Sequence, residues 1–133
     1  MSQENVEIVR EGWRIFAEQG LDAALEVYAE DCVAEEFPEM PDRTTYQGRQ
    51  GIRDRTRNFE RIWGDFSMEP FEFIDAGENV VIAMVSITGR GKQSGAAVAA
   101  PAAFVYEFEN GKVCRDRAFS SKGEALKAVG LEE

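Results

Sequence analysis

The most informative absence in this sequence is histidine, of which the chain has none. Without histidine, neither a Ser-His-Asp nor a Cys-His catalytic group can form, and every zinc or iron site with a histidine ligand is excluded. Any proton transfer must therefore use carboxylates, tyrosine, lysine or cysteine. Scattered carboxylates with no enclosing loop also make a poor transition-metal site, so we expect neither a metal nor a cofactor.

Cysteine and long apolar runs are also scarce. Cys32 and Cys114 are the only cysteines. Two are too few for a disulfide framework, and we expect both to stay reduced. The N-terminal segment MSQENVEIVREGW is acidic and polar, unlike a signal peptide, and no run approaches the length of about 18 apolar residues that a membrane span needs. These features predict a cytoplasmic protein with no membrane partner.

Basic residues are outnumbered by acidic ones, with 15 Lys and Arg against 25 Asp and Glu and a formal net charge of -10. A field of this sign repels nucleic-acid backbones and anionic lipid headgroups. In the segment RDRTRNFER, residues 53–61, the basic side chains are interleaved with acidic ones, which is typical of a solvated helix face. We therefore exclude nucleic acid as a partner.

What the sequence does contain is enough apolar side chain for one core. Its 133 residues, 44% of them hydrophobic, predict a single domain over residues 1–133. Apolar residues at helical spacing predict a helix over residues 4–19, a short second helix from residue 21 to about residue 30, and a third from about residue 49 to residue 64. Between the last two, residues 32–37 predict a strand and residues 38–46 a loop.

In the second half the apolar period changes to two. This predicts strands over residues 66–75, 80–90, 98–109 and 113–120, followed by a short helix within residues 121–131. The predicted fold class is α+β, with a curved antiparallel sheet packed against three N-terminal helices and a short C-terminal helix. The strand VVIAMVSIT is apolar on both faces, and the three helices can cover only one of them. The sequence therefore predicts a homodimer through the other face, whose outward side chains are Val105, Arg115, Arg117 and Phe119.

The order of these elements resembles the cone-shaped fold of the nuclear transport factor 2-like superfamily, and especially its SnoaL-like branch. The segments that carry the resemblance are ENVEIVREGWRIFAEQG, YQGRQGIRDRTRNF, ENGKV and GEALKAVGL, which together span nearly the whole chain. The superfamily includes ketosteroid isomerases, polyketide cyclases, dehydratases, epoxide hydrolases and noncatalytic modules. The resemblance implies a cofactor-independent isomerase, cyclase or lyase acting on a small hydrophobic carbonyl compound. The alternative is a noncatalytic ligand-binding or dimerisation module.

The resemblance places Glu36 where ketosteroid isomerase-like members have their general base, with Glu35 facing the other way. Enclosure by Phe37 and Trp13 would disfavour the charged form of Glu36, as proton transfer near neutral pH requires. The alternative is an ordinary, partly exposed carboxylate. Trp13 and Phe104 stand where the isomerases have their two oxyanion donors, so authentic steroid isomerisation is not expected.

Asp116 is the second candidate catalytic residue, assisting Glu36, and its orientation depends on one hairpin. A two-residue turn at Asn110-Gly111 would put Tyr106 on one face with Arg115. A three-residue turn would put Tyr106 on one face with Asp116 instead. The family pattern favours the three-residue turn.

In that register the inward-facing side chains form an apolar concavity with a few polar groups. The candidate ligand-binding residues are Trp13, Tyr28, Arg55, Phe59, Phe104, Tyr106, Phe108 and Ala118. Such a surface suits a hydrophobic, partly oxygenated ligand, and the alternative is that these aromatic side chains are simply core. Arg55 lies at the edge of its helix's buried stripe. It either reaches the pocket to pair with Glu36 or a ligand carboxylate, or remains solvated.

Overall fold

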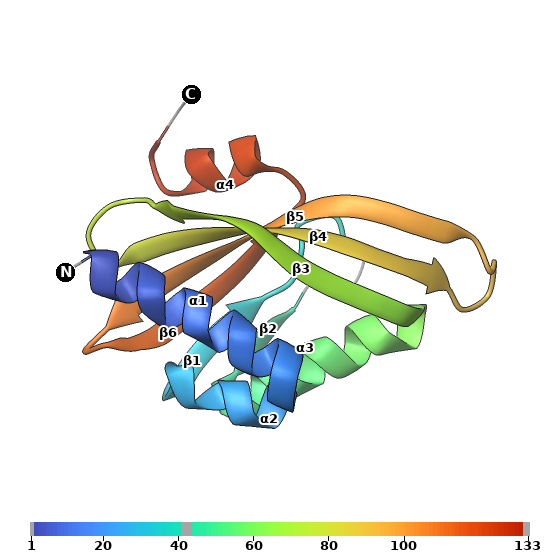
Figure 1. Ribbon diagram of the computed structural model, residues 1–133, viewed down its shortest axis with the longest axis horizontal. Coiled ribbons are helices and arrows are strands. Elements are labelled where there is room, and N and C mark those ends of the chain that lie inside the picture. The colour runs from blue at the N-terminus through green and yellow to red at the C-terminus, as the bar shows by residue number, and fades with distance from the viewer. Residues whose placement is uncertain (1, 41–43, 132–133) are drawn as a thin grey trace.

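The computed structural model describes residues 2–40 and 44–131 of the chain. Its helices are α1 (Ser2–Gln19), α2 (Leu21–Ala24), the 3-10 turn η1 (Leu25–Val27), α3 (Gly48–Ile62) and α4 (Lys122–Ala128). Its strands are β1 (Tyr28–Glu35), β2 (Thr45–Gln47), β3 (Trp63–Asp75), β4 (Val80–Gly91), β5 (Ala97–Glu109) and β6 (Lys112–Phe119). Helices α1, α2 and α3 lie on one side of the sheet and α4 lies on the other (Figure 1). The predicted α+β class is confirmed.

All the strands belong to one sheet, in the order β2-β1-β6-β5-β4-β3. The four long strands predicted from the period of two form its β3 to β6 part, and each pairs antiparallel with its neighbour. Only β1 and β6 run parallel. The sheet is open, because β2 and β3 are its edges. We call the side covered by α1 to α3 the inner face, and the side that carries α4 the outer face.

The second helix is shorter than predicted. Helical structure ends at Val27, and strand β1 begins at Tyr28. The pairing of β1 with β6 starts with Tyr28 opposite Val113. The spacing of Leu21, Leu25 and Tyr28 does mark side chains that face the core. The same spacing wrongly predicts a helical backbone at Tyr28. The extended backbone there results from pairing with a strand more than 80 residues away, which the local sequence does not indicate.

A second difference lies in the predicted loop over residues 38–46. Its last residues belong to β2, a three-residue strand that pairs antiparallel with the end of β1. Thr45 lies opposite Glu35, and Tyr46 lies opposite Ala34. So short a strand has no periodicity to detect. It matters for the site, because it carries Tyr46 to the position where β1 ends.

The central strand β4 is buried on both faces, as its composition predicts. On the inner face, Val81, Ala83 and Val85 join a cluster with residues of α1, α3 and β1. On the outer face, Ile82 and Met84 pack with a cluster that includes Ala125 of α4. Helix α4 of the same chain therefore covers part of the outer face, for which the sequence had predicted a second subunit.

The hairpin between β5 and β6 combines the two-residue turn of one expected geometry with the facing residues of the other. The chain turns at Asn110 and Gly111, both with positive φ, so the favoured three-residue turn is wrong. A bulge at Cys114 then shifts the register by one residue, and Tyr106 lies directly opposite Asp116. The expected shared face is present, but the bulge produces it rather than the turn.

Candidate functional site

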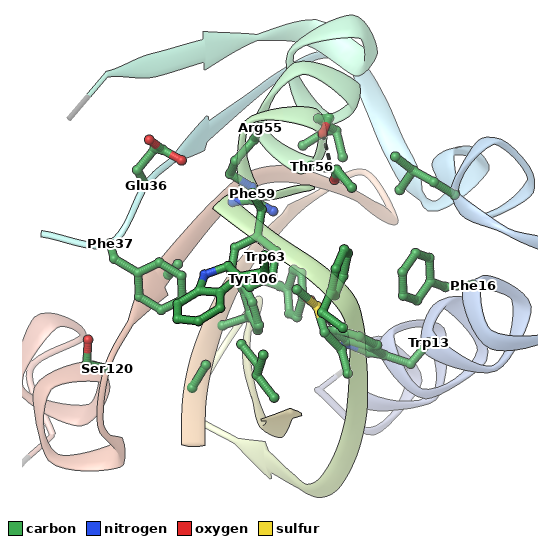
Figure 2. Close-up of a pocket in the computed structure, with 18 of the residues that line it drawn as sticks. Trp13, Phe16, Glu36, Phe37, Arg55, Thr56, Phe59, Trp63, Tyr106 and Ser120 are labelled. Atoms are coloured by element: carbon green, nitrogen blue, oxygen red, sulfur yellow. Dashed lines mark hydrogen bonds between the residues drawn. The ribbon is translucent and has the colours of Figure 1, made fainter. Parts of the chain in front are cut away.

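A cavity of about 430 Å³ lies between the inner face of the sheet and helices α1 and α3. Its size falls within the usual range for small-molecule sites. The walls are largely aromatic, with Trp13, Phe16, Phe37, Phe59, Trp63, Phe66, Phe104 and Tyr106 all bordering it. In the view of Figure 2, Glu36, Phe37 and Ser120 lie toward one side of the pocket and Trp13 and Phe16 toward the other.

The cavity is bordered by most of the candidate residues from the sequence. These are Trp13, Tyr28, Glu36, Arg55, Phe59, Phe104, Tyr106 and Ala118. Two candidates do not border it. Phe108 lies two residues closer to the hairpin turn and is buried in the core. Asp116 is 0% exposed and lies behind other side chains.

Asp116 is enclosed by its own hydrogen-bond donors. The Tyr28 hydroxyl donates to Oδ2 at 2.6 Å. The Arg55 guanidinium donates from Nη2 to Oδ2 at 2.8 Å and from Nη1 to Oδ1 at 3.1 Å. A fork of this kind satisfies a buried carboxylate on both oxygens. Asp116 therefore has no open side toward the cavity, and Arg55 and Tyr28 lie between it and the cavity space.

Arg55 reaches inward from α3, and its side chain is only 14% exposed. Figure 2 shows it directed toward the middle of the pocket. Besides Asp116, its Nη1 contacts the backbone carbonyl of Glu35 at 3.3 Å, and the guanidinium lies 5.8 Å from the centre of the Phe104 ring. Of the two alternatives left open by the sequence, the pocket position is the one observed. Its partner is Asp116 rather than Glu36.

Glu36 directly follows β1 and is buried, with 6% of its surface exposed. Asn58 of α3 donates to its Oε2 at 3.3 Å, and Tyr46 lies close by, where burial and then the nearby Glu36 charge raise the pKa of the Tyr46 hydroxyl. Within residues 2–40 and 44–131, no lysine or arginine forms an ion pair with this carboxylate. Glu35 points to the outer face, where it pairs with Arg115 at 2.7 Å.

Two polar residues beside Glu36, Asn58 and Tyr46, were not predicted from the sequence. Asn58 lies three positions after Arg55, so both project from the same side of α3, and this spacing was a usable signal. Tyr46 had no comparable signal, because its strand was predicted as loop. Trp63 falls within the third helix predicted from the sequence. It stands instead at the start of β3, where its ring lies 6.3 Å from that of Phe59.

Burial and the Asp116 charge set the protonation of the neighbouring groups. Burial raises the pKa of Tyr28 and of Tyr106 well above the ordinary value, and the nearby Asp116 charge raises both further. Burial alone would lower the pKa of Arg55, but the charge and hydrogen bonds of Asp116 outweigh it and leave this pKa raised. At neutral pH the two tyrosines are therefore neutral donors, and Arg55 and Asp116 form a charged pair.

Tyr106 also links the sheet to α1. The Trp13 indole N–H donates to the Tyr106 hydroxyl at 3.1 Å, and the Phe104 ring stacks 6.5 Å from that of Tyr106. These contacts form an aromatic wall that offers a ligand mainly apolar surface. The Tyr106 hydroxyl accepts from Trp13 and keeps its own O–H as a donor.

A search of the described residues for a metal site finds no group of three or more His, Cys, Asp or Glu side chains in suitable positions. Over the same residues, no helix is long and apolar enough to cross a membrane.

Comparison with known proteins places these features in context. A family model for the SnoaL-like domain matches residues 9–116. No curated protein matches the chain at a significant level. Among solved structures, an NTF2-like protein from Burkholderia thailandensis E264 is 20% identical with a TM-score of 0.78, over 92% of this chain and 96% of that one.

Two further solved structures contain small molecules. TerC, co-crystallised with polyporic acid, is 16% identical with a TM-score of 0.74, over 96% of this chain and 98% of that one. A protein of ketosteroid isomerase-like fold from Catenulispora acidiphila DSM 44928, in complex with trimethylamine, is 17% identical with a TM-score of 0.69, over 94% and 93%. At these identities the likeness concerns the fold.

Proposed function

The chain belongs to the SnoaL-like domain family, and we propose that its pocket binds a small hydrophobic carbonyl compound on which Glu36 moves a proton. The observation that carries this proposal is a buried carboxylate bordering an aromatic cavity, with no cation bound to it among the described residues. The small molecules named for TerC and for the trimethylamine complex support ligand binding by this fold.

The proposed step is proton removal from a carbon next to the carbonyl group. The C–H bond breaks, its proton passes to a Glu36 oxygen, and its electron pair forms a C=C bond as the carbonyl oxygen becomes an enolate. Return of the proton to a different carbon completes an isomerisation. In a dehydration, the enolate instead expels a β-hydroxyl group as the C–O bond breaks, and this oxygen takes the proton from Glu36 and leaves as water.

The surroundings of Glu36 suit this role. Asn58 donates to the carboxylate at the end of β1, and the Tyr46 hydroxyl lies near it. Apolar neighbours such as Phe37 exclude water, so a bound carbon acid meets a poorly solvated base. Asp116, which the sequence assigned to assist, contributes by holding Arg55 rather than by touching the substrate.

A matched pair of variants tests the proposal. Glu36→Gln removes the base, whereas Glu35→Gln changes the adjacent carboxylate that faces the outer side. Thermal shift measures binding of a panel of aromatic ketones, and NMR measures deuterium uptake at their α-carbons. We expect all three proteins to bind the same ketones, and only the wild type and Glu35→Gln to catalyse exchange.

Two results would decide against this mechanism. Exchange by Glu36→Gln at the wild-type rate would remove Glu36 as the base. Binding without exchange in the wild type would leave a noncatalytic ligand-binding module, which is the second candidate function. The enclosure of Asp116 favours that candidate, because it removes from the cavity the carboxyl group that the sequence assigned to assist Glu36.

We also propose that two copies pair through the outer face. Beside α4 this face carries Arg115, Glu107 and Arg117 in an ion-pair network, together with the half-buried Phe119. Among the described residues, Arg117 Nε is buried without a hydrogen-bond partner. Light scattering at micromolar concentration should give the dimer mass, and a monomer mass would refute the pairing.

A further inference from the structure

We infer that Arg55 receives an uncharged carbonyl oxygen of the ligand, and that its pairing with Asp116 makes the pocket discriminate against carboxylates. This inference rests on the proposed small-molecule function and narrows it to a chemical class. It also assigns Arg55 as the group that stabilises the enolate oxygen.

Arg55 has more N–H donors than its contacts with Glu35 and Asp116 use. A guanidinium carries five N–H groups. Those of Nη1 are directed to the Glu35 carbonyl and to Asp116, and one of Nη2 is directed to Asp116 Oδ2. Among the described residues, Nε and the second hydrogen of Nη2 have no acceptor. Because Arg55 borders the cavity, these are the donors that remain for a ligand.

The part of the pocket near Arg55 also contains acidic side chains, which oppose the binding of an anion. Asp116 neutralises Arg55 through two hydrogen bonds, so the guanidinium keeps its donors without a net local charge. Glu36 and Glu39 border the same cavity and add negative charge. A ligand carboxylate would be desolvated beside Glu36, and the only cation among the described residues that line the cavity, Arg55, is already paired with Asp116. A carbonyl oxygen accepts the same hydrogen bond without that penalty.

Arg55 also lies close to the proposed base, Glu36. Arg55 bonds to the backbone of Glu35, and Asn58, one turn later on α3, bonds to the side chain of Glu36. A single helix therefore holds the base and the donor against the end of one strand. The Arg55 guanidinium lies 5.8 Å from the centre of the Phe104 ring, on the aromatic side of the cavity, where it can donate to a developing oxyanion.

Tyr28 is a positioning residue in this arrangement. Its hydroxyl donates to the same Asp116 oxygen that accepts from Arg55 Nη2. It therefore fixes the carboxylate that fixes the guanidinium, while the aromatic wall keeps the Arg55 side chain from swinging away.

A ligand series on one scaffold provides the test. The probes are 2-acetylnaphthalene, 2-ethylnaphthalene and 2-naphthoate, which place a ketone, a hydrocarbon and a carboxylate on the same ring system. Titration calorimetry on the wild type should give a Kd for the ketone about tenfold below that for the hydrocarbon, the value of one buried charge-assisted hydrogen bond. The carboxylate should bind most weakly.

Three variants assign the preference to its cause. Arg55→Met should abolish the advantage of the ketone over the hydrocarbon. Asp116→Asn leaves Arg55 charged without a counter-ion, and should reverse the order so that the carboxylate binds more tightly than the ketone. Arg53→Gln removes an arginine on the same helix that pairs with Asp22 at the surface, and should change none of the constants.

The outcomes separate this inference from the proposed function. Binding of the hydrocarbon with no preference for the ketone would overturn the inference and leave the pocket function standing. Tighter binding of the carboxylate by the wild type, or an unchanged preference in Arg55→Met, would also overturn it. If none of the probes binds, both proposals fail. Should Asp116→Asn not fold, the wild-type series and Arg55→Met still decide the result.

Discussion

At the scale of single residues, one buried carboxylate organises the polar side of the pocket. Asp116 accepts from Tyr28 and Arg55, and its charge contributes to the raised pKa of Tyr28, Tyr106 and Cys32. Burial is the larger cause in each of these three, and it brings the pKa of Cys32 to about 11. A buried charge of this kind is tolerated only while its donors stay in place.

Tyr28→Phe and Tyr106→Phe form a matched pair that tests this dependence. Tyr28 donates to a fully buried carboxylate at 2.6 Å, so its loss should lower the free energy of unfolding by about 1.5–3 kcal/mol. The Tyr106 hydroxyl accepts from the neutral Trp13 indole, and its loss should cost about 0.5–1.5 kcal/mol. Urea denaturation measures both values. Equal costs would argue against the charge-assisted bond.

At the scale of elements, the site depends on how closely α3 approaches the edge of the sheet. Gly51 is buried where α3 packs on β2, and a Cβ added there would lie 2.8 Å from the Tyr46 backbone carbon. No side chain fits at that distance unless the helix moves. Glycine at this position allows α3 to carry Arg55 and Asn58 to the end of β1.

Two glycine substitutions separate packing from helix propensity. Gly51→Ala should destabilise the protein by roughly 1–3 kcal/mol, because the backbone must shift to admit the methyl group. Gly12→Ala in α1 meets only Val27 at an ordinary 3.5 Å and should stabilise by about 0.5–1 kcal/mol. Thermal unfolding followed by circular dichroism measures the signs. A stabilising Gly51→Ala would contradict the tight packing of α3 against β2.

At the scale of the whole molecule, one layer of helices and one face of the sheet enclose the cavity, while α4 closes part of the opposite face (Figure 1). Tyr28 and Tyr106 lie in the cluster between the layers, so their titration is coupled to unfolding of the whole domain. Stability at alkaline pH therefore reports on the integrity of the site.

The free energy of unfolding should fall as pH rises above about 10, the ordinary tyrosine pKa. Folding raises the pKa of Tyr28 and Tyr106, so above that pH the unfolded chain releases protons that the folded chain retains. The stabilising contribution is complete below the unfolded pKa and is lost as pH rises toward the folded values. Urea denaturation from pH 8 to pH 11 measures the slope. Tyr28→Phe should reduce it, and an unchanged slope would show that Tyr28 is not involved.

The sequence by itself determined the types of the long elements and several of the residues that line the pocket. Apolar side chains at helical spacing in α1 and α3, and at a period of two in β5, mark the faces that must be buried whatever their partners are. The family resemblance then assigned Trp13, Phe59, Phe104 and Tyr106 to one concavity, and all four border the cavity. The absence of histidine likewise restricted the chemistry to carboxylates, tyrosine, lysine and cysteine before any contact was known.

Only the tertiary structure decided which polar groups meet. The bulge at Cys114 brings Asp116 to the inner face, and the parallel pairing of β1 with β6 brings Tyr28 to it. The three-residue strand β2 brings Tyr46 to Glu36. These arrangements depend on a register shift and on pairing between distant segments, for which local periodicity carries no signal. The physical reason that Arg55 pairs with Asp116 rather than with Glu36 is therefore the register of the sheet.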